Sequence, residues 1–291
     1  MRWGRGGLPQ RETEAVQPFI EVRGLEYAYS LEGGGHVTAL QGIDLTIGRG
    51  EFVALIGPNG SGKSTLARHF DGLLVPTAGE VRVEGLSTSD PRSLWIVRQR
   101  VGLVFQNPDN QLVASTVEED VAFGPENLAL PPQEIRQRVD EALAIVGLAS
   151  YRTHPPHMLS GGQKQLVAIA GTLATRPACI VFDEPTSMLD PPGRRKVLET
   201  IRRLNTREGI TVVLITQSMD EAALARRVLV MHAGRIVMDG PPEEIFERGE
   251  RLRSWGLDLP PAAEIAHGLR ERGVRLPAGL LTVEALARAL C

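Results

Sequence analysis

The chain has 291 residues, of which 42% are hydrophobic and 23% are charged, a composition that excludes disordered and fibrous proteins. Its 32 Lys and Arg residues against 35 Asp and Glu residues give a net charge of −3, which provides no basic field for nucleic acid or an anionic membrane. Two cysteines, Cys179 and Cys291, are too few for a disulfide framework.

The first residues of the sequence do not have the pattern expected of a secretory signal. Residues 1–17 are polar and contain no apolar core of the kind a secretory signal needs, so we expect a flexible tail and an intracellular protein. The longest apolar runs, such as residues 212–215, are far too short to span a bilayer. Any role at a membrane would therefore depend on a partner.

Strands of two kinds are predicted along the chain. At residues 19–22 and 80–84 apolar and polar side chains alternate, as on a half-exposed antiparallel sheet. Continuously apolar runs predict strands that are buried on both faces of a parallel sheet, and they lie at residues 52–56, 101–105, 180–182 and 212–215.

Helix signals lie between these strands. Pro131-Pro132 would open an amphipathic helix with Ile135, Val139, Leu143 and Val146 on one face. Asp190-Pro191 predicts a helix that continues to about residue 205, and Ser218 with Glu221 has the spacing of a capping box. The alternation predicts a doubly wound α/β fold, with a helical subdomain inserted at about residues 107–176 and short helical pieces after about residue 250.

The strongest motif follows the strand at residues 52–56 and matches G-x-x-x-x-G-K-[ST]. Its glycines allow backbone N–H groups to surround phosphate oxygens, and the following helix N-terminus favours negative charge. Lys63 would reach the β- and γ-phosphates, while the Ser64 hydroxyl would bind Mg²⁺. The motif predicts a nucleotide site at Gly57, Pro58, Asn59, Gly60, Ser61, Gly62, Lys63, Ser64 and Thr65.

A second motif is the buried strand that ends in Asp183 and Glu184. Two adjacent carboxylates at the end of a buried strand are costly unless a cation compensates them. Beside a phosphate loop that cation is naturally Mg²⁺, held by Asp183, which leaves Glu184 to act as general base toward water. An acidic turn before Pro185 is the structural alternative.

The third motif is Leu159-Ser160-Gly161-Gly162-Gln163. Ser160 and Gln163 form a capping box for the following helix. Capping does not explain two glycines in a first turn, where each costs about 1 kcal/mol relative to Ala. The glycines therefore indicate that something approaches this backbone closely, and an anion is the usual reason.

These motifs, in this order, resemble an ATP-binding cassette (ABC) ATPase. The resemblance covers residues 19–248 and implies a P-loop fold with a parallel sheet core, an antiparallel β subdomain and an inserted helical subdomain. We therefore expect an ATPase domain at residues 18–248 and a helical extension at 249–291. The family also implies that two cassettes bind ATP between them, so that Ser160, Gly161, Gly162 and Gln163 face the ATP of a partner.

Further site residues are implied by the same resemblance. Tyr29 matches the aromatic residue that stacks on adenine, although Tyr27 competes for this role. Gln106 matches a glutamine that contacts Mg²⁺ and water, and residues 187–190 match the D-loop. Gln217 replaces the family's usual histidine at the γ-phosphate, which predicts slowed hydrolysis, and Leu166 replaces a usual arginine.

Phe105-Gln106-Asn107-Pro108-Asp109-Asn110-Gln111 and the tail after Trp255 resemble the ATPases of energy-coupling factor transporters. That group implies a peripheral subunit on the cytoplasmic face of the membrane, with a second ATPase that is identical or paralogous, a transmembrane coupling subunit and a membrane substrate-binding subunit. Such importers take up vitamins or transition-metal ions. A soluble ABC ATPase acting on DNA or ribosomes is the alternative; it lacks electrostatic support at a net charge of −3.

Overall fold

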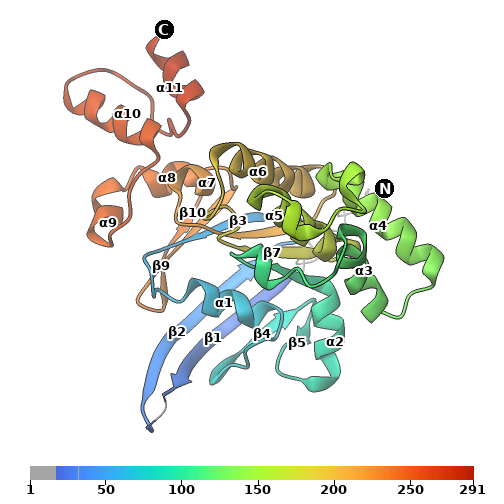
Figure 1. The fold of residues 1–291 in the computed structure, drawn as a ribbon. Coiled ribbons are helices and arrows are strands. Elements are labelled where there is room, and N and C mark those ends of the chain that lie inside the picture. The colour runs from blue at the N-terminus through green and yellow to red at the C-terminus, as the bar shows by residue number, and fades with distance from the viewer. Residues whose placement is uncertain (1–17, 32) are drawn as a thin grey trace, which may run out of the picture.

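In a computed structural model, residues 18–31 and 33–291 fold around two sheets (Figure 1). The predicted tail at residues 1–17 lies outside the described residues. The predicted fold class is confirmed: a mostly parallel sheet is combined with an antiparallel sheet, flanking helices and short helices at the C-terminus. No helix within the described ranges is long and apolar enough to cross a membrane.

The central sheet has the strand order β10-β9-β3-β8-β7-β6. Its inner strands are parallel, and all four predicted apolar runs belong to it. They form β3 (Phe52–Ile56), β6 (Val101–Val104), β7 (Cys179–Asp183) and β8 (Thr211–Ile215). Because parallel strands end at the same edge, the loops after β3, β8, β7 and β6 lie side by side there.

The sequence patterns did not predict one edge of this sheet. It is a hairpin of β9 (Arg227–His232) and β10 (Arg235–Gly240), whose strands pair antiparallel, while β9 runs parallel to β3. The second sheet has the order β2-β1-β4-β5 and is antiparallel. It comprises β1 (Ile20–Ser30), β2 (His36–Ile47), β4 (Ala78–Val83) and β5 (Leu86–Ser87).

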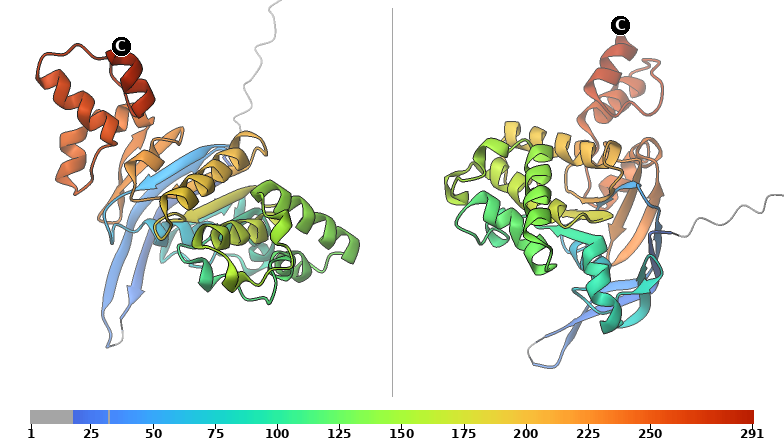
Figure 2. Two further views of the ribbon diagram at one scale, coloured as in Figure 1. Left: turned by 45° about the horizontal axis from the view of Figure 1, so that its top comes forward. Right: turned by 90° about the vertical axis from the view of Figure 1, so that its right-hand side faces the viewer.

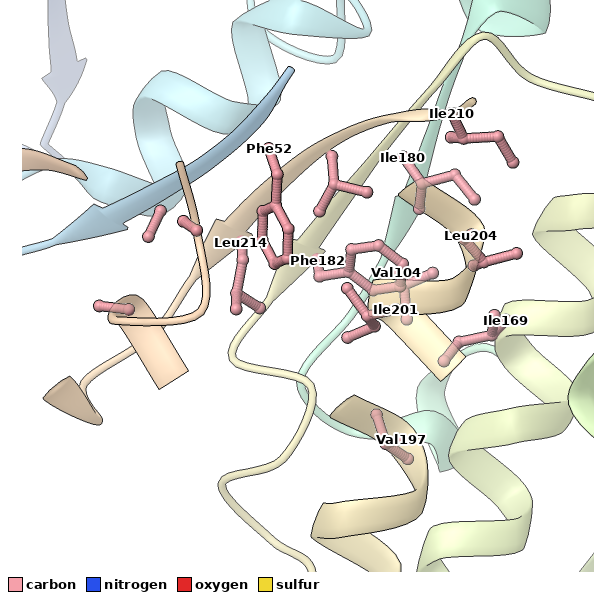
Figure 3. Packing of buried hydrophobic residues seen from close by; sticks show 14 of the residues in the cluster. Phe52, Val104, Ile169, Ile180, Phe182, Val197, Ile201, Leu204, Ile210 and Leu214 are labelled. Atoms are coloured by element: carbon pink, nitrogen blue, oxygen red, sulfur yellow. The ribbon is translucent and has the colours of Figure 1, made fainter. Parts of the chain in front are cut away.

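Side chains of the parallel strands alternate between two cores. Phe52, Ile180 and Phe182 point to the face covered by α6 (Pro191–Thr206) and α5 (Gly161–Ala174), as Figure 3 shows. Their neighbours Val53 and Val181 face α1 (Lys63–Phe70) and the antiparallel sheet. Burial on both faces explains why these strands are apolar throughout.

Helices α3 (Val117–Asn127) and α4 (Pro132–Val146) pack with α5 beside the parallel sheet, and α2 (Pro91–Arg100) leads into β6. Helix α4 begins at Pro132 as predicted, and Asp190 caps α6 by accepting a hydrogen bond from the Gly193 N–H. Short 3₁₀ turns lie at Pro108–Asn110, Ala149–Tyr151 and Pro156–Met158.

The chain after residue 260 stands apart from the sheets (Figure 2), whereas residues 242–246 pack against β9 and β10. Leu252, Leu257 and Leu259 still pack on the main core, whereas Ala262, Ala266, Leu280 and Leu286 form a small separate cluster. The helices are α8 (Pro242–Phe246), α9 (Gly249–Ser254), α10 (Pro261–Glu271) and α11 (Val283–Leu290).

The capping box predicted at Ser218 is wrong. Ser218 does precede α7 (Met219–Ala222), but its side chain makes no capping hydrogen bond, and Glu221 is buried instead of reaching back to it. The reason is tertiary: Glu221 bonds residues of three other segments, which outweighs the local cap.

Candidate functional site

The loop between β3 and α1 is shaped by close backbone packing. At Gly57 a Cβ would lie 2.3 Å from the Met231 carbonyl oxygen, and at Gly62, where φ is +101°, it would lie 2.7 Å from that of Ala39. Gly62 precedes Lys63 at the start of α1 and has no side chain to cap the helix. The first N–H groups of α1 are therefore free of a side-chain cap and suited to an anion.

Lys63 is 5% exposed and lies folded against this loop. Its Nζ donates hydrogen bonds to the carbonyl oxygens of Gly57 (2.8 Å) and Pro58 (3.1 Å). Burial lowers the pKa of the ammonium, while the nearby carboxylates of Glu184 and Asp183 act in the opposite direction. Because an ammonium has three donors, one proton remains for a phosphate oxygen.

Asp183 ends β7 opposite the start of α1. Its Oδ1 accepts a hydrogen bond from the Ser64 hydroxyl at 2.9 Å. Burial raises the pKa of the Asp183 carboxyl, and the Ser64 hydrogen bond only partly opposes this rise. The two predicted metal-binding oxygens are therefore adjacent, in a place where the ionised carboxylate needs compensation.

Glu184 turns away from β7 with a φ of +49°, a left-handed conformation that costs a non-glycine residue about 1–3 kcal/mol. Its N–H donates to the Ile215 carbonyl oxygen at 3.0 Å, which holds the turn against the end of β8. The carboxylate accepts hydrogen bonds from Nε2 of Gln217 at 2.6 Å and from Nε2 of Gln106 at 3.4 Å. The predicted general base is thus held by two predicted site glutamines.

Both glutamines have second partners. Gln217 Nε2 also donates to Asn59 Oδ1 at 3.0 Å, so Gln217 joins the phosphate loop to Glu184. Gln106 Nε2 also donates to the Ser187 hydroxyl at 3.1 Å, which connects it to the segment at residues 187–190. Glu184, in the loop after β7, therefore receives donors from the loops after β6 and β8, and Gln217 connects it to the loop after β3.

Tyr29 lies on β1 next to the same helix. Its hydroxyl is 3.1 Å from Thr65 Oγ1, and the Tyr27 ring meets the Tyr29 ring edge-on at a centroid distance of 4.9 Å. Tyr27 also packs edge-on against buried His69, 4.9 Å between centroids, and against the core. Of the two tyrosines, Tyr29 is therefore the one hydrogen-bonded to Thr65, and Tyr27 packs against the Tyr29 ring.

The capping box at the start of α5 is confirmed. The Gln163 N–H donates to Ser160 Oγ at 3.3 Å, and the Ser160 N–H donates to Gln163 Oε1 at 2.9 Å. The inference that an anion explains both glycines needs correction. A Cβ on Gly162 would lie 2.8 Å from the Cα of Gly193, so helix packing within the chain already requires that glycine.

Gly161 has the freer position. A Cβ there would meet only Leu189 Cδ2 at 3.4 Å, and both Ser160 and Gly161 are exposed. Leu166, at the position of the family's usual arginine, is buried in the main core. This end of α5 therefore presents its exposed N-terminus outward while its later residues build the core.

Sequence patterns missed a buried polar cluster behind the glutamines. Thr186, Thr216 and Glu221 are all buried, both threonine hydroxyls donate hydrogen bonds to the Glu221 carboxylate, and Arg194 pairs with Glu221. The available signal was the position of two threonines, one two residues after Glu184 and the other directly before Gln217.

Comparison with known proteins identifies the family. The ABC transporter family matches residues 40–187. A relative from Symbiobacterium thermophilum, the energy-coupling factor transporter ATP-binding protein EcfA1, is 58% identical across 95% of this chain and 98% of its own length. The chain belongs to the ABC transporter family. Within it, the chain groups with the ATP-binding proteins of energy-coupling factor transporters.

Solved structures agree with this assignment. CbiO1 of Clostridium perfringens, part of an ABC transporter complex, has a TM-score of 0.74 at 39% identity, covering 86% of this chain and 99% of that one. The cassette MJ0796, solved as a dimer in a post-hydrolysis state bound to ADP and phosphate, has a TM-score of 0.69 at 32% identity, covering 77% and 98%. Membership of the family implies ATP binding and ATP hydrolysis coupled to transport.

Proposed function

We propose that this chain is the ATP-hydrolysing motor subunit of an energy-coupling factor importer, which takes up a vitamin or a transition-metal ion through its membrane partners. The observation that carries the proposal is the convergence of Gln106 and Gln217 on Glu184, beside the phosphate loop. The domain division stays as expected from the sequence: an ATPase domain at 18–248, with a helical subdomain at about 107–176, and an extension at 249–291.

The triphosphate would lie over the loop formed by residues 57–65. Backbone N–H groups at the start of α1 and the Lys63 ammonium supply donors for its oxygens. Ser61 Oγ is buried without a hydrogen-bond partner in the described part of the chain, which marks a place for a further acceptor. Tyr29 would place its ring against adenine, a contact worth about 1–3 kcal/mol by analogy with base stacking.

The residues present fit Mg²⁺. Ser64 Oγ and Asp183 Oδ1 are oxygen atoms 2.9 Å apart, and hard cations prefer oxygen ligands. Ser64 and the Gln106 amide oxygen would bind the ion directly, and Asp183 would hold it through water. When bound, the ion neutralises charge that develops on the phosphate oxygens.

Glu184 would act as general base toward the water that attacks the γ-phosphate. Its two carboxylate oxygens are fixed by amide donors of Gln217 and Gln106, which orients the carboxylate. The proton would leave water for a Glu184 oxygen as the new P–O bond forms, while the bond between the γ-phosphorus and the bridging β–γ oxygen breaks and ADP leaves with that oxygen. Gln217 lies between Asn59 and Glu184, so it would donate to the γ-phosphate from there.

A second cassette would complete each site. Ser160 and Gly161 are exposed at the capped start of α5, where the positive end of the helix suits a partner's γ-phosphate. Gly162 packs against Gly193 beneath that surface, and Gln163 fixes Ser160 through the capping box. The dimer of the similar cassette MJ0796 supports a paired arrangement.

Replacement of Glu184 by Gln in the assembled transporter tests the proposal. Loss of the general base should slow single-turnover ATP hydrolysis by about 10²–10⁴-fold and leave MgATP affinity nearly unchanged. Glu250→Gln is the matched control, because Glu250 is exposed on α9. If Glu184→Gln hydrolysed ATP at the original rate, Glu184 would not be the general base. Copurification of the chain with ribosomes or DNA would favour the soluble alternative.

The membrane partners are expected to dock beside Gln106. Val113 is 70% exposed there, and the buried Asp120 carboxylate holds its segment by accepting the N–H bonds of Val113 (2.9 Å) and Ala114 (3.0 Å). Leu112, by contrast, packs on the main core, so it is unsuitable for an interface test. The site would lie at the cytoplasmic face of the membrane.

Val113→Asp should uncouple transport from ATP hydrolysis or prevent assembly, while isolated MgATP binding stays unchanged. A charged group in an apolar helix-in-groove contact is costly, which is the reason for the expected loss. Val283→Asp, at 69% exposure on α11, is the control. Normal transport by Val113→Asp would refute this docking site.

A further inference from the structure

Glu221 is a carboxylate on α7 that is 1% exposed and lies four residues after Gln217 in the chain. Its Oε1 accepts a hydrogen bond from the Thr186 hydroxyl at 2.6 Å and pairs with Arg194 Nε at 2.7 Å. Its Oε2 accepts from the Thr216 hydroxyl at 2.6 Å. A buried carboxylate is costly unless it is paired and hydrogen-bonded, and here both oxygens are satisfied.

The partners of Glu221 flank the catalytic pair. Thr186 lies two residues after Glu184 in the loop that leaves β7, and Thr216 directly precedes Gln217 at the end of β8. Glu221 thus joins the loop carrying Glu184 to the segment carrying Gln217. The Thr216 hydroxyl also accepts the Ser218 N–H at 3.0 Å, which fixes the backbone on both sides of Gln217.

Arg194 extends the same cluster into the first turns of α6. Its guanidinium pairs with Glu221 and also donates to the Ser218 hydroxyl. A cavity of about 490 Å³ is lined by Glu184, Gln217 and Glu221 among other residues, so the buried carboxylate and the catalytic groups border one space. Movement of α6 or of α7 would therefore displace both Glu184 and Gln217.

We propose that Glu221 is a positioning residue for hydrolysis: through Thr186 and Thr216 it sets the separation at which Gln217 Nε2 reaches Glu184 Oε1. This inference rests on the proposed role of Glu184 and Gln217. Their hydrogen bond is 2.6 Å long, so separating the two segments by about 1 Å takes the pair beyond hydrogen-bond distance. A misplacement of about 1 Å in a catalytic group can cost about 10²-fold in rate.

Isosteric variants test the link. Thr186→Val and Thr216→Val each remove one hydroxyl donor and keep the side-chain shape. Each should slow single-turnover hydrolysis in the assembled transporter by at least about tenfold, with the MgATP Kd within about twofold of the original. Thr200→Val is the matched control, because Thr200 is a buried threonine of α6 whose hydroxyl donates only to the Lys196 carbonyl oxygen, at 2.8 Å.

Amide hydrogen exchange provides a second readout that does not need hydrolysis. Thr186→Val should accelerate exchange at residues 216–218, on the far side of Glu221, and Thr200→Val should not. An unchanged rate in both hydroxyl variants, or equal slowing by Thr200→Val, would overturn the positioning role. If the original chain hydrolyses no ATP, the proposed function fails. Independently of hydrolysis, the positioning role of Glu221 would be refuted if Thr186→Val accelerated amide exchange only at residues 184–189.

Discussion

Replacement of Gln217 by histidine is expected to accelerate ATP hydrolysis at this chain's own site. The Gln217 amide nitrogen carries two protons, and both are already donated, to Glu184 Oε1 at 2.6 Å and to Asn59 Oδ1 at 3.0 Å. A hydrogen bond to the γ-phosphate therefore requires one of them to be released. The amide also carries no titratable proton, unlike an imidazole.

The size of the effect follows from these contacts. Release of the neutral bond to Asn59 costs about 0.5–1.5 kcal/mol, and complete loss of a preorganised transition-state donor costs about 2.7–4 kcal/mol, or about 10²–10³ in rate. Gln217→His should therefore raise the single-turnover rate by about tenfold or more. ATP affinity should change little, because in the proposed site many donors of residues 60–65 would hold the phosphates.

The measurement is single-turnover hydrolysis by both chains under matched assembly, together with the MgATP Kd. A paralogous partner with its own histidine would leave one fast site in the complex, whereas an identical partner would make both sites slow. Equal rates for the two chains would show that the glutamine performs the histidine's role, and they would refute the expected rate cost of Gln217.

Three further outcomes are expected from the packing and the charges. Gly162→Ala should lower the free energy of unfolding in urea by about 1–3 kcal/mol, because the new Cβ would lie 2.8 Å from the Gly193 backbone. Gly268→Ala is the control, because a Cβ there meets open space in α10. Equal stabilities of the two variants would refute the close contact. Lys63→Ala should weaken MgATP binding at least about tenfold by calorimetry while the fold is retained, and unchanged affinity would count against the phosphate site. Burial raises the pKa of Asp71 to about 6, above its unfolded value, so its contribution to stability falls as pH rises from about 4 to 6. Asp71→Asn should therefore stabilise the fold by about 3 kcal/mol at pH 7.5 and by little at pH 4, which urea unfolding at both values checks.

Local patterns were sufficient to predict four strands of the central sheet and the turn between β3 and α1. The apolar runs at residues 52–56 and 212–215 became β3 and β8, because burial on both faces leaves no polar position in such a strand. The capping box of Ser160 and Gln163 was likewise predictable, since its partners are three residues apart and need no distant contact.

The same local pattern failed at Ser218 and Glu221, which have identical spacing. There the carboxylate is drawn into the interior by Thr186, Thr216 and Arg194, and only the fold brings these residues together. The contact between Gly162 and Gly193 was equally invisible, because it depends on how α5 and α6 cross.

By itself, the sequence determined the α/β class and the motifs from which the site residues are proposed, because each depends on neighbours within a few positions. Tertiary structure alone decided how those motifs meet. Gln217 bonds Asn59 across 158 positions of the chain, and Glu184 receives donors from loops after β6 and β8. Side-chain distances of this kind follow from strand order and helix packing, and periodicity carries no information about either.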